Sequence, residues 1–182
     1  DGMAEPRMNS EYPDLLKTVK TPLGATVSLT YKSALADGNP DAPEGTIVLA
    51  TETSNDGRGG GATTSYSYAG GNWNYAERQS LGFQAVTAKL PCIGSETGSQ
   101  CPTVASYFNQ SVACLGKVSM VDRYLVNGST GLERRYEGKT LDSVVPMRCL
   151  DSSTSVYESS PATWFADWRQ SVVYRYFDKW GN

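Results

Sequence analysis

The sequence predicts an all-β protein, with antiparallel sheets built from consecutive β-hairpins and at most one short helix, near residues 162–170. Three observations favour this class. The 182 residues include 11 Tyr and 4 Trp beside many Thr, Ser and Val, which are residues enriched in strands. Several short segments alternate between apolar and polar residues, as half-buried antiparallel strands do. Turns rich in Gly and Asn separate these segments, as they do in hairpins.

The N-terminal residues differ in composition from the rest of the chain. Asp1–Pro13 is polar and rich in turn-forming residues, so we expect a connecting arm there. Residues 14–182 are expected to form a β-hairpin segment. The pattern of strands and turns repeats in kind from Gly116, so two structural units, 14–113 and 114–182, are an alternative to one continuous unit.

The first half contains the clearest strand, Ala25–Lys32, in which Val27, Leu29 and Tyr31 alternate with polar residues. The other strands expected here are Thr46–Thr53, Thr63–Tyr68, Gly82–Ala88 and Thr103–Phe108. Asp37–Gly45 is rich in Pro, Gly and Asp and is expected to be a loop. Asn55–Gly61 (NDGRGGG) predicts a tight reversal, and therefore a hairpin between the strands on either side of it.

The second half predicts a similar series of elements. Strands are expected at Lys117–Val126, Leu132–Glu137, Ser143–Leu150 and Ser171–Phe177, a turn at Asn127–Gly131, and a polar loop at Ser152–Pro161. Trp164, Phe165 and Trp168 have the i, i+1, i+4 spacing of a helix, which places the short helix over 162–170. The chain then ends in a Gly-Asn turn after a strand, and such a turn normally leads to a partner strand. We therefore expect this chain to be a segment of a longer one.

Four cysteines allow three pairings. Cys92 and Cys101 flank a Gly- and Ser-rich stretch that predicts a turn, so a local bridge between them is favoured, which leaves Cys114 with Cys149. If both bridges form, the chain matures in an oxidising compartment and is secreted or displayed at the cell surface. A four-cysteine zinc site is disfavoured because the paired C-x(2–4)-C spacing is missing. Buried free thiols in a cytosolic protein remain the alternative.

Composition excludes several classes of function. The formal net charge of −3 provides no overall basic field for nucleic acid or for an anionic membrane. No apolar run approaches the roughly 20 residues of a membrane helix, so we expect no membrane insertion by this segment. The chain contains no His, which excludes Ser-His-Asp and Cys-His catalysis and every His-ligated metal site. We therefore expect no enzyme activity, no cofactor and no metal.

Two sets of residues suggest chemistry only weakly. Asp37, Asn39 and Asp41 have the D-x-N-x-D spacing that opens a calcium loop, but Ala42 and Val48 stand where an EF-hand needs Gly and Glu. A solvated acidic turn is the favoured interpretation. The aromatic residues Trp73, Trp164, Trp168 and Trp180 are of the kind that stacks on sugars. The alternative function is therefore a secreted all-β module that binds carbohydrate or a cell surface.

Several stretches, taken in order, resemble the insecticidal toxin complex B component of the TcdB/SpvB type and its Rhs/YD-repeat relatives. The resemblance covers Asp14–Tyr31 (DLLKTVKTPLGATVSLTY), Thr51–Phe83 (TETSNDGRGG…TSYSYAGG…ER…LGF), Ser106–Lys117 (SYFNQ…LGK) and Val173–Asn182 (VYRYFDKWGN). The residues that carry it are Tyr66, Tyr68, Gly70, Gly71, Glu77, Arg78, Gly82, Phe83, Tyr174, Tyr176, Gly181 and Asn182. The chain departs from the family in its four cysteines and in 149–168, which does not align.

The resemblance implies a shell. In that family long β-hairpins wind into a hollow cocoon that encloses a toxic C-terminal polypeptide, and the wall itself performs no chemistry here. The implied function is a non-enzymatic structural segment of a secreted toxin-delivery protein. Its implied partners are the rest of its own longer chain, the encapsulated toxin polypeptide and the other subunits of a toxin complex. The resemblance also implies a structural role for Arg78, whose side chain would bond the backbone carbonyls of a neighbouring strand.

Overall fold

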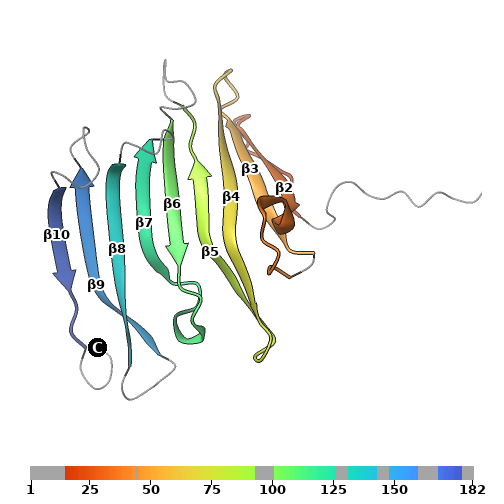
Figure 1. Ribbon diagram of the computed structural model, residues 1–182. Coiled ribbons are helices and arrows are strands. Elements are labelled where there is room, and N and C mark those ends of the chain that lie inside the picture. The colour runs from red at the N-terminus through yellow and green to blue at the C-terminus, as the bar shows by residue number, and fades with distance from the viewer. Residues whose placement is uncertain are drawn as a thin grey trace, which may run out of the picture.

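The computed structural model describes residues 15–43, 45–92, 101–125, 131–142, 148–159 and 168–177. These residues form one ten-stranded sheet in which every neighbouring pair of strands is antiparallel (Figure 1). The spatial order of the strands is their order in the chain, so the sheet is a series of consecutive hairpins. This topology confirms the all-β class and the hairpin arrangement expected from the sequence.

The first five strands are β1 (Thr18–Lys20), β2 (Thr26–Ser33), β3 (Ile47–Asn55), β4 (Gly61–Asn74) and β5 (Gln79–Lys89). The other five are β6 (Pro102–Phe108), β7 (Val118–Leu125), β8 (Gly131–Leu141), β9 (Cys149–Ser159) and β10 (Trp168–Tyr174). Two short 3-10 helices interrupt them, η1 (Ala34–Asp37) before β3 and η2 (Val112–Cys114) before β7. Within the described ranges, no helix is long and apolar enough to cross a membrane.

The elements predicted near both ends of the chain differ from those that the structure shows. Strand β1 was not expected, and the polar loop predicted over Ser152–Pro161 is wrong because residues up to Ser159 belong to β9. The helix predicted over 162–170 is wrong at its C-terminal end, where Trp168–Gln170 begin β10, and its other residues lie outside the described part. Also outside the described part are residues 143–147 of a predicted strand and the predicted turns over 127–130 and 178–182.

The β3–β4 hairpin shows how local residues set the register. Asn55 Oδ1 accepts a hydrogen bond from Gly57 N at 2.8 Å, and Asp56 Oδ1 accepts from Arg58 N at 2.7 Å and from Gly60 N at 3.0 Å. These side chains satisfy the backbone of the turn and align Asn55 opposite Gly61. The tight reversal expected over 55–61 is therefore present.

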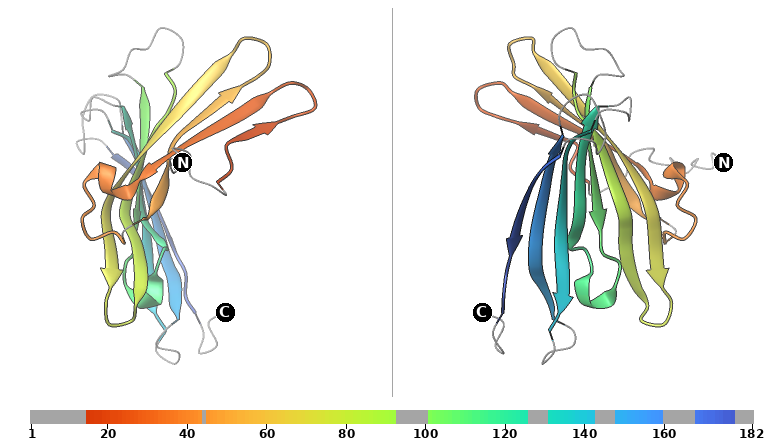
Figure 2. Two further views of the ribbon diagram at one scale, coloured as in Figure 1. Left: turned by 90° about the vertical axis from the view of Figure 1, so that its right-hand side faces the viewer. Right: turned by 60° about the vertical axis from the view of Figure 1, so that its left-hand side comes forward.

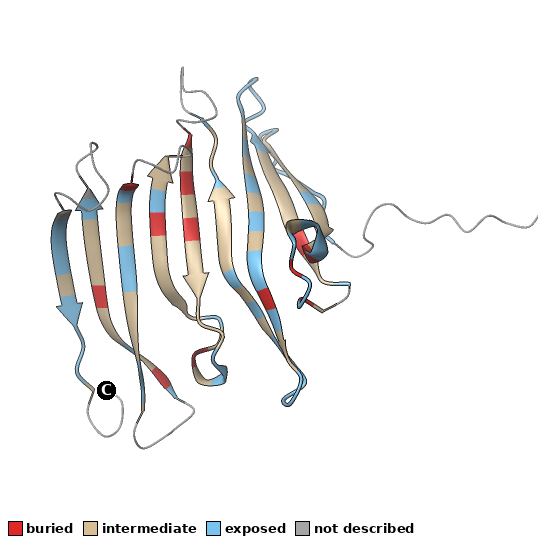
Figure 3. Cartoon of the chain, in the orientation of Figure 1, coloured by how far each residue is buried: buried red, intermediate tan, exposed pale blue. Residues whose placement is uncertain are grey.

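The sheet is a single layer with little interior. Figure 3 shows that most described residues are exposed or intermediate and that buried ones are scattered along the strands. The buried apolar residues are Ala34, Ala42, Val48, Ala105 and the disulfide residues Cys101, Cys114 and Cys149. The one described apolar cluster consists of Ala34, Ala42 and Val48, with Tyr68 and Phe83 packed against it. Cross-strand pairs therefore carry most of the stabilisation that a core supplies in a globular domain.

One such pair joins β7 to β8. Arg134 lies opposite Asp122, and its Nε and Nη2 each donate to one carboxylate oxygen at 2.6 Å. Both side chains are largely buried, so the pair is shielded from water. These hydrogen bonds raise the pKa of Arg134 above its ordinary value. Tyr136 continues the same face and meets Tyr157 of β9 edge to face, with ring centroids 5.7 Å apart.

The sheet is strongly bent. Register shifts interrupt the pairing at five places, including Thr30/Tyr31 between β2 and β3 and Asn72/Trp73 between β4 and β5. Such bulges increase the local twist of a sheet. Figure 2 shows the result, because the β1–β2 and β3–β4 turns lean away from the surface that β5–β10 follow.

Both disulfides expected from the cysteine spacing are present. Cys92 bonds Cys101, at a sequence separation of 9, and Cys114 bonds Cys149, at a separation of 35. The first bridge closes the connection between β5 and β6. The second joins the end of η2 to the start of β9 and so encloses the whole β7–β8 hairpin.

The two bridges should stabilise the fold unequally. In the chain-entropy treatment, closing the short loop contributes about 2.7 kcal/mol and closing the long loop about 3.8 kcal/mol. We expect the double variant Cys114→Ser/Cys149→Ser to lose more free energy of unfolding than Cys92→Ser/Cys101→Ser. Urea denaturation followed by circular dichroism measures both variants, each acting as the control for the other. A larger loss in the Cys92/Cys101 variant would contradict the expected order.

Candidate functional site

Half of the residues that carry the family resemblance lie on β4 and β5. Gly71 of β4 is opposite Phe83 of β5, and the rings of Tyr68 and Phe83 are 5.0 Å apart between centroids. A Cβ added at Gly71 would lie only 3.0 Å from Ala42 Cβ and 3.1 Å from Phe83 Cε1. This position therefore needs Gly because another segment of the chain packs directly on the strand.

That segment is the stretch between η1 and β3, and together with Lys32 of β2 and Asp37 of η1 it completes the hydrogen bonding of β4. Strand β3 pairs with β4 only from Thr51↔Ser65 to Asn55↔Gly61. Beyond Ser65 the backbone groups of β4 that face β3 have no strand beside them. A buried backbone group without a hydrogen-bond partner is costly, so other groups must take the place of the strand.

Three side chains take that place, and we call Lys32, Asp37 and Asn39 the β4 clasp. Lys32 Nζ donates to Tyr66 O at 2.9 Å, and Asp37 Oδ2 accepts from Tyr68 N at 3.0 Å. Asn39 Nδ2 donates to Tyr68 O at 2.8 Å, while Asn39 Oδ1 accepts from Gly71 N at 3.0 Å. The clasp thus gives β4 alternating donors and acceptors, as a neighbouring strand would.

The clasp is itself held in place by its own contacts. Lys32 Nζ donates to Asp37 Oδ1 at 2.6 Å, so both oxygens of Asp37 are engaged. Asn39 is only 3% exposed, and its Nδ2 also donates to Ala34 O at 3.1 Å. The solvated acidic turn predicted for Asp37, Asn39 and Asp41 is therefore wrong for Asn39, which is buried, whereas Asp41 is exposed.

The remaining resemblance residues are scattered. Gln110 Nε2 donates to Gly70 O at 2.6 Å and to Gly82 O at 3.0 Å, so both glycine carbonyls are joined through the β6–β7 connection. Glu77 and Arg78 lie exposed in the β4–β5 turn, where Arg78 has a left-handed φ of 51°. The bonding expected for the Arg78 side chain stays a prediction. Tyr174 and Tyr176 are exposed near the end of β10, and Gly181 and Asn182 lie outside the described residues.

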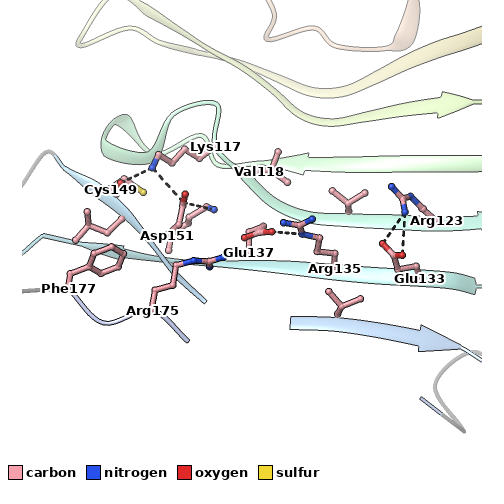
Figure 4. Close-up of a pocket in the computed structure, with 14 residues that line it drawn as sticks. Lys117, Val118, Arg123, Glu133, Arg135, Glu137, Cys149, Asp151, Arg175 and Phe177 are labelled. Carbon is pink, nitrogen blue, oxygen red and sulfur yellow. Dashed lines mark hydrogen bonds and ion pairs between the residues drawn. The ribbon is translucent and has the colours of Figure 1, made fainter. Parts of the chain in front are cut away.

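A second candidate site is a charged groove of about 1030 Å³ on the face of β7, β8 and β9 (Figure 4). Its charged residues are Lys117, Arg123, Glu133, Arg135, Glu137, Lys139, Asp151 and Arg175. Val118, Val121, Leu150, Val156, Phe177 and Cys149 complete the lining. The four groove residues of β8 are spaced two apart, so they point to one side of the sheet.

Ion pairs run along this groove. Arg123 pairs with Glu133 at 3.2 Å, Arg135 pairs with Glu137, and Lys139 pairs with Asp151 at 2.8 Å. The hydrogen bond from Lys139, with the charges of Lys139 and Lys117, lowers the pKa of Asp151. The carboxylate of Asp151 is therefore ionised at neutral pH. The sequence analysis did not single out this groove, although the alternating charges of Glu133, Arg135, Glu137 and Lys139 are its signal.

The described residues contain no group of three or more Cys, Asp or Glu side chains arranged to hold a metal ion. Of the aromatic residues of the alternative binding module, only Trp73 has a described side chain, and it does not line the charged groove. Trp73 is half-buried on β4, and Trp164 and Trp180 lie outside the described part.

Comparison with known proteins relates the chain to toxins. A family model described as the insecticide toxin TcdB middle/N-terminal region matches residues 4–114, more than half of the chain. The Tc holotoxin pore structure of Photorhabdus luminescens matches with a TM-score of 0.71 and 13% identity, over 92% of this chain and 11% of that chain. No curated protein matches this chain.

Two crystal structures of TcdB2-TccC3 assemblies also match. The TcdB2-TccC3-TEV structure has a TM-score of 0.61 and 13% identity, over 82% of this chain and 11% of that chain. The TcdB2-TccC3-Cdc42 structure has a TM-score of 0.58 and 14% identity, over 79% of this chain and 10% of that chain. At these identities the matches show a shared fold, and this chain spans about a tenth of the length of each solved chain.

The β4 clasp should be necessary for stability. We expect Asn39→Ala to lower the free energy of unfolding by about 1–3 kcal/mol, because it removes the hydrogen-bond partners of the buried Gly71 N–H and of the partly buried Tyr68 carbonyl. Urea denaturation measures the change. Asp41→Ala is the matched control, since Asp41 is an exposed residue of the same loop. Equal stability of the two variants would show that Asn39 does not support β4.

Proposed function

This chain belongs to the insecticide toxin TcdB middle/N-terminal region family, and on that premise we propose that it is a non-enzymatic structural segment of a toxin-delivery protein. In this proposal the sheet is part of a wall that encloses a C-terminal toxin polypeptide. The membership confirms the TcdB-type part of the resemblance found in the sequence. The Rhs/YD-repeat part, which depends on the residues near Asn182, stays a prediction.

One observation supports the wall more than any other: the sheet is broad, single-layered and open at its edges. Within the described ranges no strand pairs with the outer side of β1 or of β10. Val173 and Tyr174 on β10 are 55% and 67% exposed. An open edge of this kind is a template for another strand, and a closed shell would use it to continue the sheet.

The proposed partners follow from the wall. They are the rest of a longer polypeptide, the enclosed toxin and the other subunits of a toxin complex. The two disulfides support maturation in an oxidising compartment, so we propose that the protein is secreted or exposed at a cell surface. A wall that acts by enclosure needs no cofactor and no catalytic residues of its own.

The backbone of β10 allows a direct test of its edge. Arg175 N donates to Ser152 O of β9, so the N–H groups of Tyr174 and Val172 point away from β9, because alternate residues of a strand bond to opposite sides. Tyr174→Pro therefore removes an outward donor without removing a bond to β9. Tyr174→Ala is the matched control, because it also loses the ring but keeps the N–H.

We expect the isolated 182-residue chain to show β-sheet circular dichroism and to associate as its concentration rises. Sedimentation velocity should show that Tyr174→Ala still associates, whereas Tyr174→Pro shifts toward the monomer with an unchanged spectrum. A wild-type chain that remains monomeric at every concentration would contradict the open edge.

A further inference from the structure

The charged groove differs in charge from the chain that carries it. The chain as a whole has 16 basic and 19 acidic residues, whereas five basic and three acidic side chains line the groove. The excess of positive charge is therefore local, on a protein whose formal net charge is −3. A surface of this kind attracts acidic partners although the protein as a whole repels them.

In two of the ion pairs of the groove, the cation is more exposed than the carboxylate. The side chains of Arg123 and Arg135 are 55% and 50% exposed, whereas those of their partners Glu133 and Glu137 are 28% and 12% exposed. In these two pairs the guanidinium group is therefore the more accessible partner. The order is reversed where β9 begins, because the side chain of Asp151 is 52% exposed and that of Lys139 is 12% exposed.

The excess is concentrated at the end of the groove where β9 begins. Lys117 and Lys139 share the single carboxylate of Asp151, at 3.6 Å and 2.8 Å. Arg175 donates to Thr154 Oγ1 at 3.0 Å, and in the described part of the chain no ion pair joins it to a carboxylate. Figure 4 shows Lys117, Asp151 and Arg175 at this end, with Phe177 beside them.

We propose that the charged groove holds an extended, acidic stretch of polypeptide, and that this stretch belongs to the polypeptide enclosed by the shell. The occupant rests on the proposed function, whereas the acidic character rests on the charges of the groove. A carboxylate of the bound chain lies between Lys117 and Arg175. Apolar side chains of the bound chain contact Leu150, Val156 and Phe177.

The lining favours polypeptide over an anionic polymer. A nucleic acid or a sulfated polysaccharide carries negative charge at every unit, and Glu133, Glu137 and Asp151 would repel it along the groove. A polypeptide alternates charged, polar and apolar side chains, and it therefore matches a lining that mixes both signs of charge with Val, Leu and Phe.

The openness of the site favours an enclosed chain over a free one. Solvent-exposed ion pairs contribute only about 0–1 kcal/mol each, so a freely diffusing peptide would bind weakly. A polypeptide confined inside a shell is present at a high effective concentration, and weak contacts then suffice to keep it on the wall.

The first experiment measures binding of a short fluorescein-labelled peptide of alternating Glu and Ser to the 182-residue chain by fluorescence anisotropy. We expect binding that weakens as salt rises from about 50 mM to about 300 mM, because screening reduces attraction between exposed charges. The corresponding Lys-Ser peptide should not bind. Equal binding of the two peptides, or no binding of the acidic one at low salt, would overturn the proposal.

Matched variants locate the site. Lys117→Gln and Arg175→Gln should each weaken binding of the acidic peptide about threefold to tenfold. Arg58→Gln changes the net charge equally in the exposed β3–β4 turn and should leave binding unchanged. An equal loss in Arg58→Gln would show that only net charge matters. Tighter binding of dextran sulfate than of the acidic peptide would identify an anionic polymer as the ligand and would also overturn the proposal.

The second experiment tests the source of the bound stretch in the assembled toxin complex. A benzophenone amino acid replaces Val121 in the groove, and the control complex carries it in place of Val19, which is exposed on β1. Mass spectrometry should find cross-links from position 121 to an acidic stretch of the enclosed polypeptide. Cross-links to another subunit, or none to the enclosed chain in an intact complex, would overturn the inference alone. Absence of any enclosed polypeptide would instead contradict the proposed function.

Discussion

Hydrogen bonding along every strand is the constraint on which this structure depends, because the sheet has almost no interior to stabilise it by other means. Where two strands run side by side, the constraint is met by backbone pairing. Where β3 diverges from β4, it is met by the β4 clasp, whose Lys, Asp and Asn side chains present the donors and acceptors of a missing strand. The small apolar cluster around Ala34 forms beneath the same segment.

The same constraint explains what could be predicted from the sequence. Strands with one apolar face, such as the one around Leu29, show regular alternation and were placed correctly. From Ser152 on, strand β9 (CLDSSTSVYES) consists largely of Ser with Thr and Glu, and this polar composition predicted a loop. In a sheet with water on both faces such residues are acceptable in a strand, because neither face has to be apolar. The aromatic spacing at Trp168 predicted a helix, but pairing with β9 determines the conformation there.

The two candidate sites show a different limit to what the sequence can predict. The spacing of Asp37 and Asn39 was visible in the sequence, but their role depends on where β3 leaves β4, and only the tertiary structure shows that. The charged groove depends on register, because its ion pairs join residues of different strands such as Arg123 and Glu133. The cysteine pairing was easier, because the Gly- and Ser-rich stretch after Cys92 favoured a local bridge and left one other pair.

These features together support the proposed wall: hairpins in chain order, two faces in water, disulfides at the connections and, within the described residues, outer strands with no further neighbour. Amide hydrogen exchange of β10 tests this account most directly, by comparing the isolated chain with the assembled toxin complex. If β10 continues into a further strand, the N–H groups of Val172 and Tyr174 exchange rapidly in the isolated chain and become protected in the complex. Equally rapid exchange in both would contradict a sheet that continues beyond β10.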